Sequence, residues 1–218
     1  MVSELCNGGI GMNFSIDQAR RWIEKTNQYM QQNKQLLTKL DRAIGDGDHG
    51  MNMARGFNEV IHTVKETDYE SISDLMKDVA VTLMSKVGGV AGPLYGTAFL
   101  KISQAWSGKN QIDYETFTKG FKEAVLGIKE RGRTSRGEKT LVDVWVAVVH
   151  YFECKEEIDA EQLIIIAYDA VEKTKEMIGT KGRTAYLKEN SLGHIDPGAM
   201  SSYYIFRSLS EVLKEDET

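Results

Sequence analysis

The stretch Leu141-Val-Asp-Val-Trp-Val-Ala-Val-Val149 decides which class of fold this chain adopts. It is so rich in valine that residue propensity alone favours a β-strand. A strand needs a neighbouring strand to complete its backbone hydrogen bonds, and the sequence contains no other strand-like run. We therefore predict that this stretch is a buried helix and that the fold is all-α.

Helical periodicity extends over most of the remaining chain. Met53, Phe57, Val60, Ile61 and Val64 follow the spacing i, i+4, i+7, i+8 and i+11, which is typical of an amphipathic helix. The short connections are typical of an up-and-down antiparallel barrel or bundle. The eight predicted helices cover about residues 16–40, 50–67, 75–84, 93–106, 113–131, 141–149, 159–178 and 196–213.

Three helix starts carry recognisable signals. Ser15 is followed three residues later by Gln18, as in a capping box. Asp196 precedes Pro197, and Asp as N-cap before Pro at the first helical position is a strong start signal. Pro93 in the same way predicts the start of the fourth helix.

Composition and charge exclude several classes of function. The 218 residues contain 27 Lys and Arg against 32 Asp and Glu, a net charge of -5, which argues against a nucleic-acid partner. No stretch approaches the ~18 consecutive apolar residues of a membrane helix. The use of only 2 cysteines and the lack of a secretory pattern favour the cytoplasm. We predict a flexible N-terminal tail over residues 1–12 and a single domain over 13–218.

Most of the 20 glycines fall in four connections, at residues 41–50, 87–96, 127–137 and 179–198. Alternate connections of an up-and-down array lie at the same end, so these four are expected to meet. Glycine lets a backbone approach a ligand closely, and the N-termini of the second, fourth, sixth and eighth helices at that end attract anions. Glycine also terminates helices, but termination alone does not explain the one-sided distribution.

Three carboxylates lie close together in the first of these connections. Asp41, Asp46 and Asp48 would repel one another unless a cation compensates, and Mg²⁺ prefers carboxylate and phosphate oxygens. Because they precede a helix N-terminus that attracts phosphate, they predict Mg²⁺ bridging the protein to a nucleotide. The alternative interpretation is a solvated acidic turn that caps a helix.

The connection before the valine-rich stretch is open to two interpretations. Gly132 and the run Gly137-Glu-Lys-Thr140 resemble a P-loop whose spacing is wrong by one residue, and no strand leads into them. With Arg133, Arg136 and Lys139, this segment is either a phosphate-facing loop or a solvated basic turn.

Five motifs occur in order along most of the chain: Gly45-Asp-Gly-Asp-His-Gly50, Gly88-Gly-Val-Ala-Gly-Pro-Leu-Tyr-Gly-Thr-Ala98, Gly137-Glu-Lys-Thr-Leu141, Gly182-Arg183 and Gly193-His-Ile-Asp-Pro-Gly198. Together they resemble the L subunits of dihydroxyacetone kinases. That resemblance implies an eight-helix barrel that binds ADP or ATP and two Mg²⁺ at one end.

The same resemblance implies roles for individual residues. Asp41, Asp46 and Asp48 would hold the two Mg²⁺ and thereby carry catalysis. At Ala91 the family often has a small hydroxyl residue, and at Lys188-Glu-Asn190 it usually has an arginine. The residues that would bind the nucleotide are His49, Gly50, Met51, Asn52, Val90, Ala91, Gly132, Leu141, Arg183, Asp196, Pro197 and Gly198.

Members of this family act with partner subunits. In the phosphotransferase-dependent type, which a standalone chain resembles, ADP stays bound and a phosphohistidine on an M subunit recharges it. The phosphoryl group then passes to dihydroxyacetone held on a K subunit, and a homodimer stays open. The alternatives are an ATP-dependent kinase component for another small keto-sugar and an ADP-loaded docking module that regulates transcription. The three intact aspartates favour catalysis.

Overall fold

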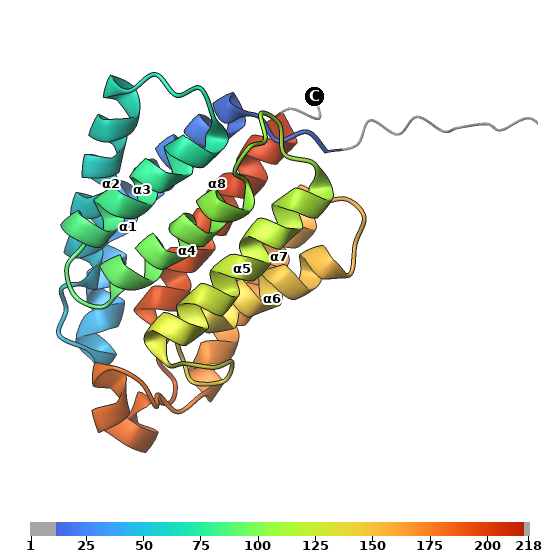
Figure 1. Cartoon of the computed structure of the whole chain (residues 1–218). Helices are drawn as coiled ribbons and strands as arrows, with labels where there is room; N and C mark the ends of the chain where they lie inside the picture. Colours follow the sequence, from blue (N-terminus) through green and yellow to red (C-terminus); the bar gives the residue numbers. More distant parts are fainter. Residues whose placement is uncertain (1–11, 216–218) are drawn as a thin grey trace, which may run out of the picture.

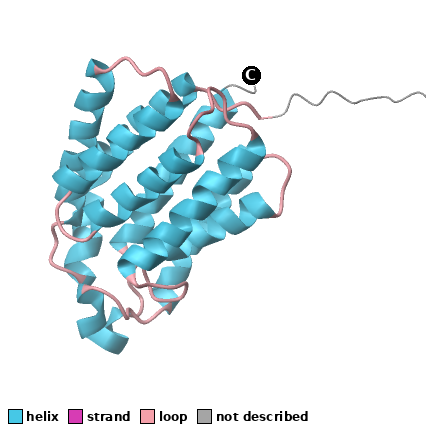
Figure 2. Ribbon diagram, viewed as in Figure 1, coloured by secondary structure: helices cyan, strands magenta, loops and turns pink. Residues whose placement is uncertain are grey.

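The computed structural model describes residues 12–215, which form eight α-helices, two 3₁₀ segments and no strand (Figure 1, Figure 2). The all-α prediction is therefore confirmed, and the predicted tail lies outside the described residues except for Met12. No described helix has both the length and the apolar character needed to cross a membrane. The helices are α1 (Ile16–Ile44), α2 (His49–Glu66), α3 (Ile72–Lys86), α4 (Ala91–Ala105), α5 (Tyr114–Gly132), α6 (Leu141–Glu153), α7 (Ala160–Lys173), η1 (Thr174–Glu176), η2 (Arg183–Ser191) and α8 (Pro197–Glu215).

The valine-rich stretch is helical and forms most of α6. Thr140 and Asp143 form a capping box, in which the Val142 N–H donates to Thr140 Oγ1 and the Thr140 N–H donates to Asp143 Oδ2 (2.8 Å). Val144 and Trp145 are fully buried. Burial against neighbouring helices, rather than the β propensity of valine, thus decides the conformation of this segment.

The helices form a closed ring, because each packs against the next and α8 packs against α1 (Figure 1). α8 also contacts α6, and most of its residues are buried. Its serines 201, 202, 208 and 210 are buried, and each hydroxyl has a hydrogen-bond partner inside the protein. These small side chains let α8 lie deep among its neighbours without leaving an unsatisfied hydroxyl.

The bounds of several helices differ from the prediction: α1 and α6 end later, at Ile44 and Glu153, and α3 is longer at both ends. α4 begins at Ala91, so Pro93 is its third residue; this costs no hydrogen bond, because the first four N–H groups of a helix have no partner within it. α7 ends at Lys173 instead of near residue 178, and the chain continues as η1. η2 was not predicted, since its sequence carries no helical periodicity. The predicted capping box of Ser15 and Gln18 is confirmed.

Candidate active site

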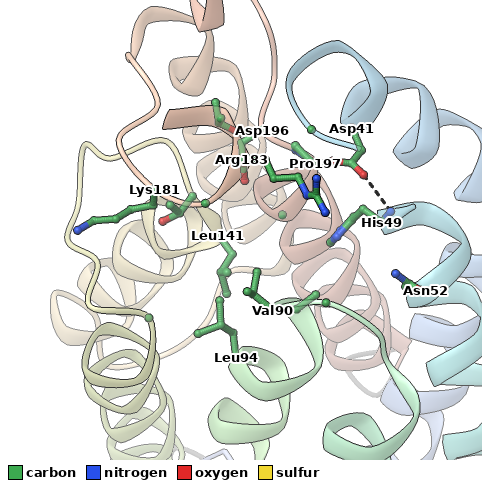
Figure 3. A pocket seen from close by; sticks show the side chains of 18 of the residues that line it. Asp41, His49, Asn52, Val90, Leu94, Leu141, Lys181, Arg183, Asp196 and Pro197 are labelled. Atoms are coloured by element: carbon green, nitrogen blue, oxygen red, sulfur yellow. Dashed lines mark hydrogen bonds between the residues drawn. The ribbon is translucent and has the colours of Figure 1, made fainter. Parts of the chain in front are cut away.

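One end of the barrel contains a cavity of about 690 Å³ (Figure 3). Residues of the α1–α2, α3–α4, α5–α6 and α7–α8 connections all line it, so the four glycine-rich connections do meet at one end. The first residue of each following helix also lines it, namely His49 of α2, Ala91 of α4, Leu141 of α6 and Pro197 of α8. The backbone N–H groups at these helix starts favour an anionic ligand.

The three aspartates converge on this cavity. One carboxylate oxygen of each of Asp41, Asp46 and Asp48 lies within 4.8 Å of the others. Asp41 is buried in the last turn of α1, and its Oδ2 accepts the N–H groups of Asp48 (2.9 Å) and His49 (3.0 Å; Figure 3). The α1–α2 connection can fold this closely onto Asp41 because Gly45 has no Cβ; a Cβ at this position would lie 2.1 Å from Asp41 Oδ1.

The chemistry of this donor set fits Mg²⁺. All the converging groups are carboxylate oxygens, which hard divalent cations prefer, and none is nitrogen or sulfur. Arg183 pairs with Asp46, at 2.7 Å between Nη2 and Oδ2, but it neutralises only one of the three charges. Asp46 and Asp48 are exposed, as in a solvated acidic turn, but Asp41 is buried and one of its carboxylate oxygens lies close to theirs, which favours a cation site.

His49 joins α2 to a buried polar network. Its Nε2 lies 2.9 Å from Ser201 Oγ, which lies 2.7 Å from the hydroxyl of Tyr95. The Tyr95 hydroxyl donates to the Gly198 carbonyl (2.8 Å) and also contacts Ser202 Oγ. Burial lowers the pKa of His49 to about 4, although Asp41 and Asp46 oppose this shift. His49 is therefore neutral at pH 7 and serves as a hydrogen-bond partner rather than as a cation.

The start of α8 is polar and buried. Asp196 caps the helix, since its Oδ2 accepts the Ala199 N–H at 2.7 Å. Burial raises the pKa of the Asp196 carboxyl to about 7, and the nearby Asp143 adds to the shift while Lys139 opposes it. Lys139 is only 2% exposed and lines the cavity, whereas Arg136 is exposed to solvent. Lys139 thus fits a loop that faces the cavity, whereas Arg136 fits a solvated basic turn, and neither interpretation describes the whole α5–α6 connection.

The opposite side of the cavity is apolar. Val90, Leu94 and Leu141 lie close together there (Figure 3). Gly132 belongs to the same wall, and a Cβ at this position would lie 3.2 Å from Leu94 Cδ2. The cavity thus combines an apolar wall with carboxylates and helix N-termini, which suits a molecule with a flat apolar part and an anionic part.

Most residues that the sequence predicted for the nucleotide lie together in this cavity, but two do not line it. Gly50 packs against α1, where a Cβ would lie 2.1 Å from the carbonyl oxygen of Lys34. The side chain of Met51 is 57% exposed to solvent. The predicted residues that line the cavity are Asp41, Asp46, Asp48, His49, Asn52, Val90, Ala91, Gly132, Leu141, Arg183, Asp196, Pro197 and Gly198.

Several residues of the cavity were not among the predicted ligands. Leu94 lies four residues after Val90, so helical spacing from a predicted residue could have identified it. Lys181 lies next to the Gly182-Arg183 motif, and its position there is a similar signal. Tyr95 and Thr184 could have been identified in the same two ways, since Tyr95 lies four residues after Ala91 and Thr184 directly follows Arg183, but their hydrogen bonds to Gly198 and Ile44 join segments far apart in the sequence.

Comparisons with known proteins agree with the resemblance that the sequence motifs indicate. The DAK2 domain model matches residues 43–211. The ADP-binding subunit DhaL of PEP-dependent dihydroxyacetone kinase 1 from Listeria innocua is 44% identical over 198 residues, covering 91% of this chain and 97% of the relative. The corresponding Escherichia coli subunit is 36% identical over 210 residues, covering 94% and 100%. The crystal structure of the C. freundii dihydroxyacetone kinase has the same fold, with a TM-score of 0.73 at 20% identity over 97% of this chain and 37% of that one.

Proposed function

The chain belongs to the DAK2 domain family, and from this premise we propose that it is the ADP-binding subunit of a PEP-dependent dihydroxyacetone kinase. The bacterial relatives described above carry that name, and the match covers nearly their whole length. Such a subunit is a phosphotransferase component that keeps a nucleotide bound while the phosphoryl group passes through it. The organisation of the cavity supports the same role.

One observation carries the proposal: Asp41, Asp46 and Asp48 converge at a cavity that the N-termini of four helices surround. A phosphoryl group in transfer is stabilised mainly by positioning and by positive charge near its oxygens. The helix N-termini supply part of that charge, and cations held by the aspartates would supply the rest. The apolar wall on the other side would receive the nucleobase.

The three aspartates would hold two Mg²⁺ ions, which would neutralise the phosphate oxygens of the nucleotide. Asp41 is already fixed by the N–H groups of Asp48 and His49, so little reorganisation is needed when a ligand arrives. The guanidinium of Arg183 lies beside Asp46 and would donate to a phosphate oxygen. Asn52 lies one turn into α2 and would donate its side-chain amide to the same anion.

The base would pack between Leu94 and Leu141, with the backbone of Gly132 beside it. Ala91 has no hydroxyl, so the start of α4 would contact phosphate through backbone N–H groups alone. His49 is neutral at pH 7 and would accept or donate one hydrogen bond at the start of α2. The cavity groups assigned above serve the nucleotide and its cations, and we assign the activation of the sugar to the partner that holds it.

The sugar and the phosphoryl donor would therefore come from partners. We propose a K subunit that holds dihydroxyacetone and an M subunit whose phosphohistidine converts the bound ADP to ATP. The same cavity would then serve two half-reactions, with ADP acting as a cofactor rather than as a product that leaves. An ATP-dependent component for another keto-sugar would share the cavity but release its nucleotide after each turnover.

The first experiment is to purify the protein without added nucleotide, denature it and chromatograph the supernatant. We expect about one ADP per chain, retained through dialysis with Mg²⁺ and released by EDTA. An empty protein that exchanges ATP freely would favour the ATP-dependent alternative. A protein that binds neither nucleotide in the presence of Mg²⁺ would contradict the proposed function.

Phosphoryl transfer separates catalysis from regulation by docking. The wild-type chain, with purified K and M subunits and phosphoenolpyruvate-driven phosphorylation of M, should convert dihydroxyacetone to its phosphate. Asp46→Ala should fold but lose this activity. If Asp46→Ala were as active as the wild type, the assignment of the metal ligands would be wrong; if the wild type were inactive but retained ADP, the docking module would be favoured.

A further inference from the structure

The segment between α7 and α8 closes on itself at its base. The Gly193 N–H donates to the Lys175 carbonyl at 2.8 Å, and the Asp196 N–H donates to Thr174 Oγ1 at 3.1 Å. Residues 175–195 therefore form a loop whose two ends meet, and we call this loop the strap. It contains the last two residues of η1 and the whole of η2.

The far part of the strap reaches the α1–α2 connection (Figure 1). The Arg183 guanidinium pairs with Asp46 at 2.7 Å, and Thr184 Oγ1 donates to the Ile44 carbonyl at 3.1 Å. Lys181 also lies on the strap and, like Arg183, lines the cavity (Figure 3). Arg183 and Thr184 thus join the far part of the strap to the α1–α2 connection.

Lys139 lies at the base of the strap and contacts both of its ends. Its ammonium donates to the Thr174 carbonyl (2.5 Å) and to the His194 carbonyl (2.5 Å). The side chain is almost fully buried, and an ammonium group is costly to bury unless it is well hydrogen-bonded. Burial lowers the pKa of Lys139, while Asp196 and Asp143 nearby favour its charged form.

The backbone of Lys139 is also unusual. Its φ is 60°, in the left-handed region that residues other than glycine seldom adopt. Such a conformation persists only where the surroundings fix it. Glycine would adopt this conformation more easily, so the backbone gives no reason for a lysine at this position. The two hydrogen bonds from its ammonium to carbonyl groups do give one.

We propose that Lys139 is a positioning residue that closes the base of the strap and so holds Arg183 beside the carboxylates and the nucleotide. The inference rests on the proposed function only in that the ligand of the cavity is taken to be ADP. Lys139 acts through the strap and needs no contact with the ligand. Its loss should therefore loosen residues 177–193 in the nucleotide-free protein and speed the release of ADP from the loaded one.

The test compares four variants with the wild type. Lys139→Met keeps the length of the side chain but removes both hydrogen bonds, and Lys139→Arg keeps the charge and the donors. Gly193→Ala strains the same closure from the strap, because Gly193 has a φ of 79° with no atom near its missing Cβ. Ser210→Ala is the matched control, since it removes a buried hydrogen bond to the Ala160 carbonyl at the other end of α7.

Two measurements are made on each protein: hydrogen exchange of residues 177–193 without nucleotide, and the rate of ADP dissociation with Mg²⁺. For Lys139→Met we expect both rates to rise roughly tenfold or more, because two hydrogen bonds from a charged donor are lost. Lys139→Arg should recover most of this effect, and Gly193→Ala should show a smaller rise in both. Ser210→Ala should lower the melting temperature without changing either rate.

The inference is overturned if Lys139→Met behaves like Ser210→Ala in both measurements. Should Lys139→Met not fold, Gly193→Ala decides in its place, and unchanged exchange and release in that variant would overturn the inference. A wild-type protein that holds no ADP contradicts the proposed function instead. Hydrogen exchange in the strap is measured without nucleotide, so it tests the role of Lys139 even if the protein binds no ADP.

Discussion

Arg183 Nη2 lies 2.7 Å from Asp46 Oδ2, so an ion pair joins the strap to the α1–α2 connection beside the cavity. The two side chains are 69% and 33% exposed, and they approach from segments far apart in the chain. Exposed ion pairs contribute little to stability, because water already solvates both charges well. The pair therefore matters for the arrangement of the site more than for the fold.

Arg183→Gln should separate these two effects. We expect the free energy of unfolding, measured by urea denaturation without Mg²⁺, to change by less than about 1 kcal/mol. ADP should dissociate roughly ten to a hundred times faster, because a charge-assisted hydrogen bond to phosphate is lost. A large loss of stability with unchanged ADP release would show that the ion pair is structural.

Asp41 and Asp46 should differ in their effect on stability although both would bind metal. Asp41→Ala removes the acceptor of two backbone N–H groups at the start of α2, and we expect a loss of about 1–3 kcal/mol. Asp46→Ala removes an exposed carboxylate and should leave the metal-free protein nearly as stable as the wild type.

Both variants should lose Mg²⁺-dependent retention of ADP, which equilibrium dialysis measures. The comparison is made in EDTA for stability and in Mg²⁺ for binding. Equal loss of stability in the two variants would contradict the conclusion that Asp41 stabilises the start of α2 by accepting two backbone hydrogen bonds.

The stability of the nucleotide-free protein should depend on pH through Asp196. Its pKa is raised from 3.8 to about 7, so between these values the folded protein holds a proton that the unfolded chain has released. Stability from this group is therefore complete below pH 3.8 and is lost as the pH rises through 7. Asp196→Asn should remove that loss and keep the cap of α8.

Urea denaturation in EDTA at pH 5 and pH 8 measures this effect. From pH 5 to pH 8, the free energy of unfolding of the wild type should fall by about 2–3 kcal/mol more than that of Asp196→Asn. His49 acts in the opposite direction, since its pKa is lowered to about 4 and its contribution is lost as the pH falls. Both proteins contain His49, so its effect cancels in the comparison; a difference that does not change with pH would refute the raised pKa of Asp196.

Gly50→Ala should destabilise the fold through helix packing. A Cβ there would lie 2.1 Å from the Lys34 carbonyl oxygen and 2.7 Å from the Thr38 nitrogen, so α2 would have to move away from α1. We expect a loss of about 2–4 kcal/mol in urea denaturation. Gly108→Ala is the control, since it has open space and a φ of 75°, and should cost about 1 kcal/mol from backbone strain alone. Equal losses in the two variants would contradict the packing role of Gly50.

The sequence predicted most of the fold because helices depend on local spacing. Amphipathic periodicity and helix-start signals placed most of the α-helices, and the order of short connections placed the glycine-rich segments at one end. Even the valine-rich start of α6 was assigned correctly, since a strand without a partner leaves its backbone hydrogen bonds unmade. The aspartates could be recognised from local sequence too: they lie within eight residues of one another, and carboxylates that close repel unless a cation compensates.

The tertiary structure alone decided which residues reach the cavity and what holds them there. Lys139 lies 35 residues from Thr174 and 55 from His194, and the sequence left its segment open between two interpretations. Gly50 stays a predicted nucleotide residue, but it does not line the cavity, and its Cα packs closely against α1. Periodicity fixes the face of a helix that is buried, whereas the direction of a loop side chain depends on segments that only packing brings together. For this reason the sequence predicted which connections meet at the cavity, and the packing of distant segments arranged their side chains.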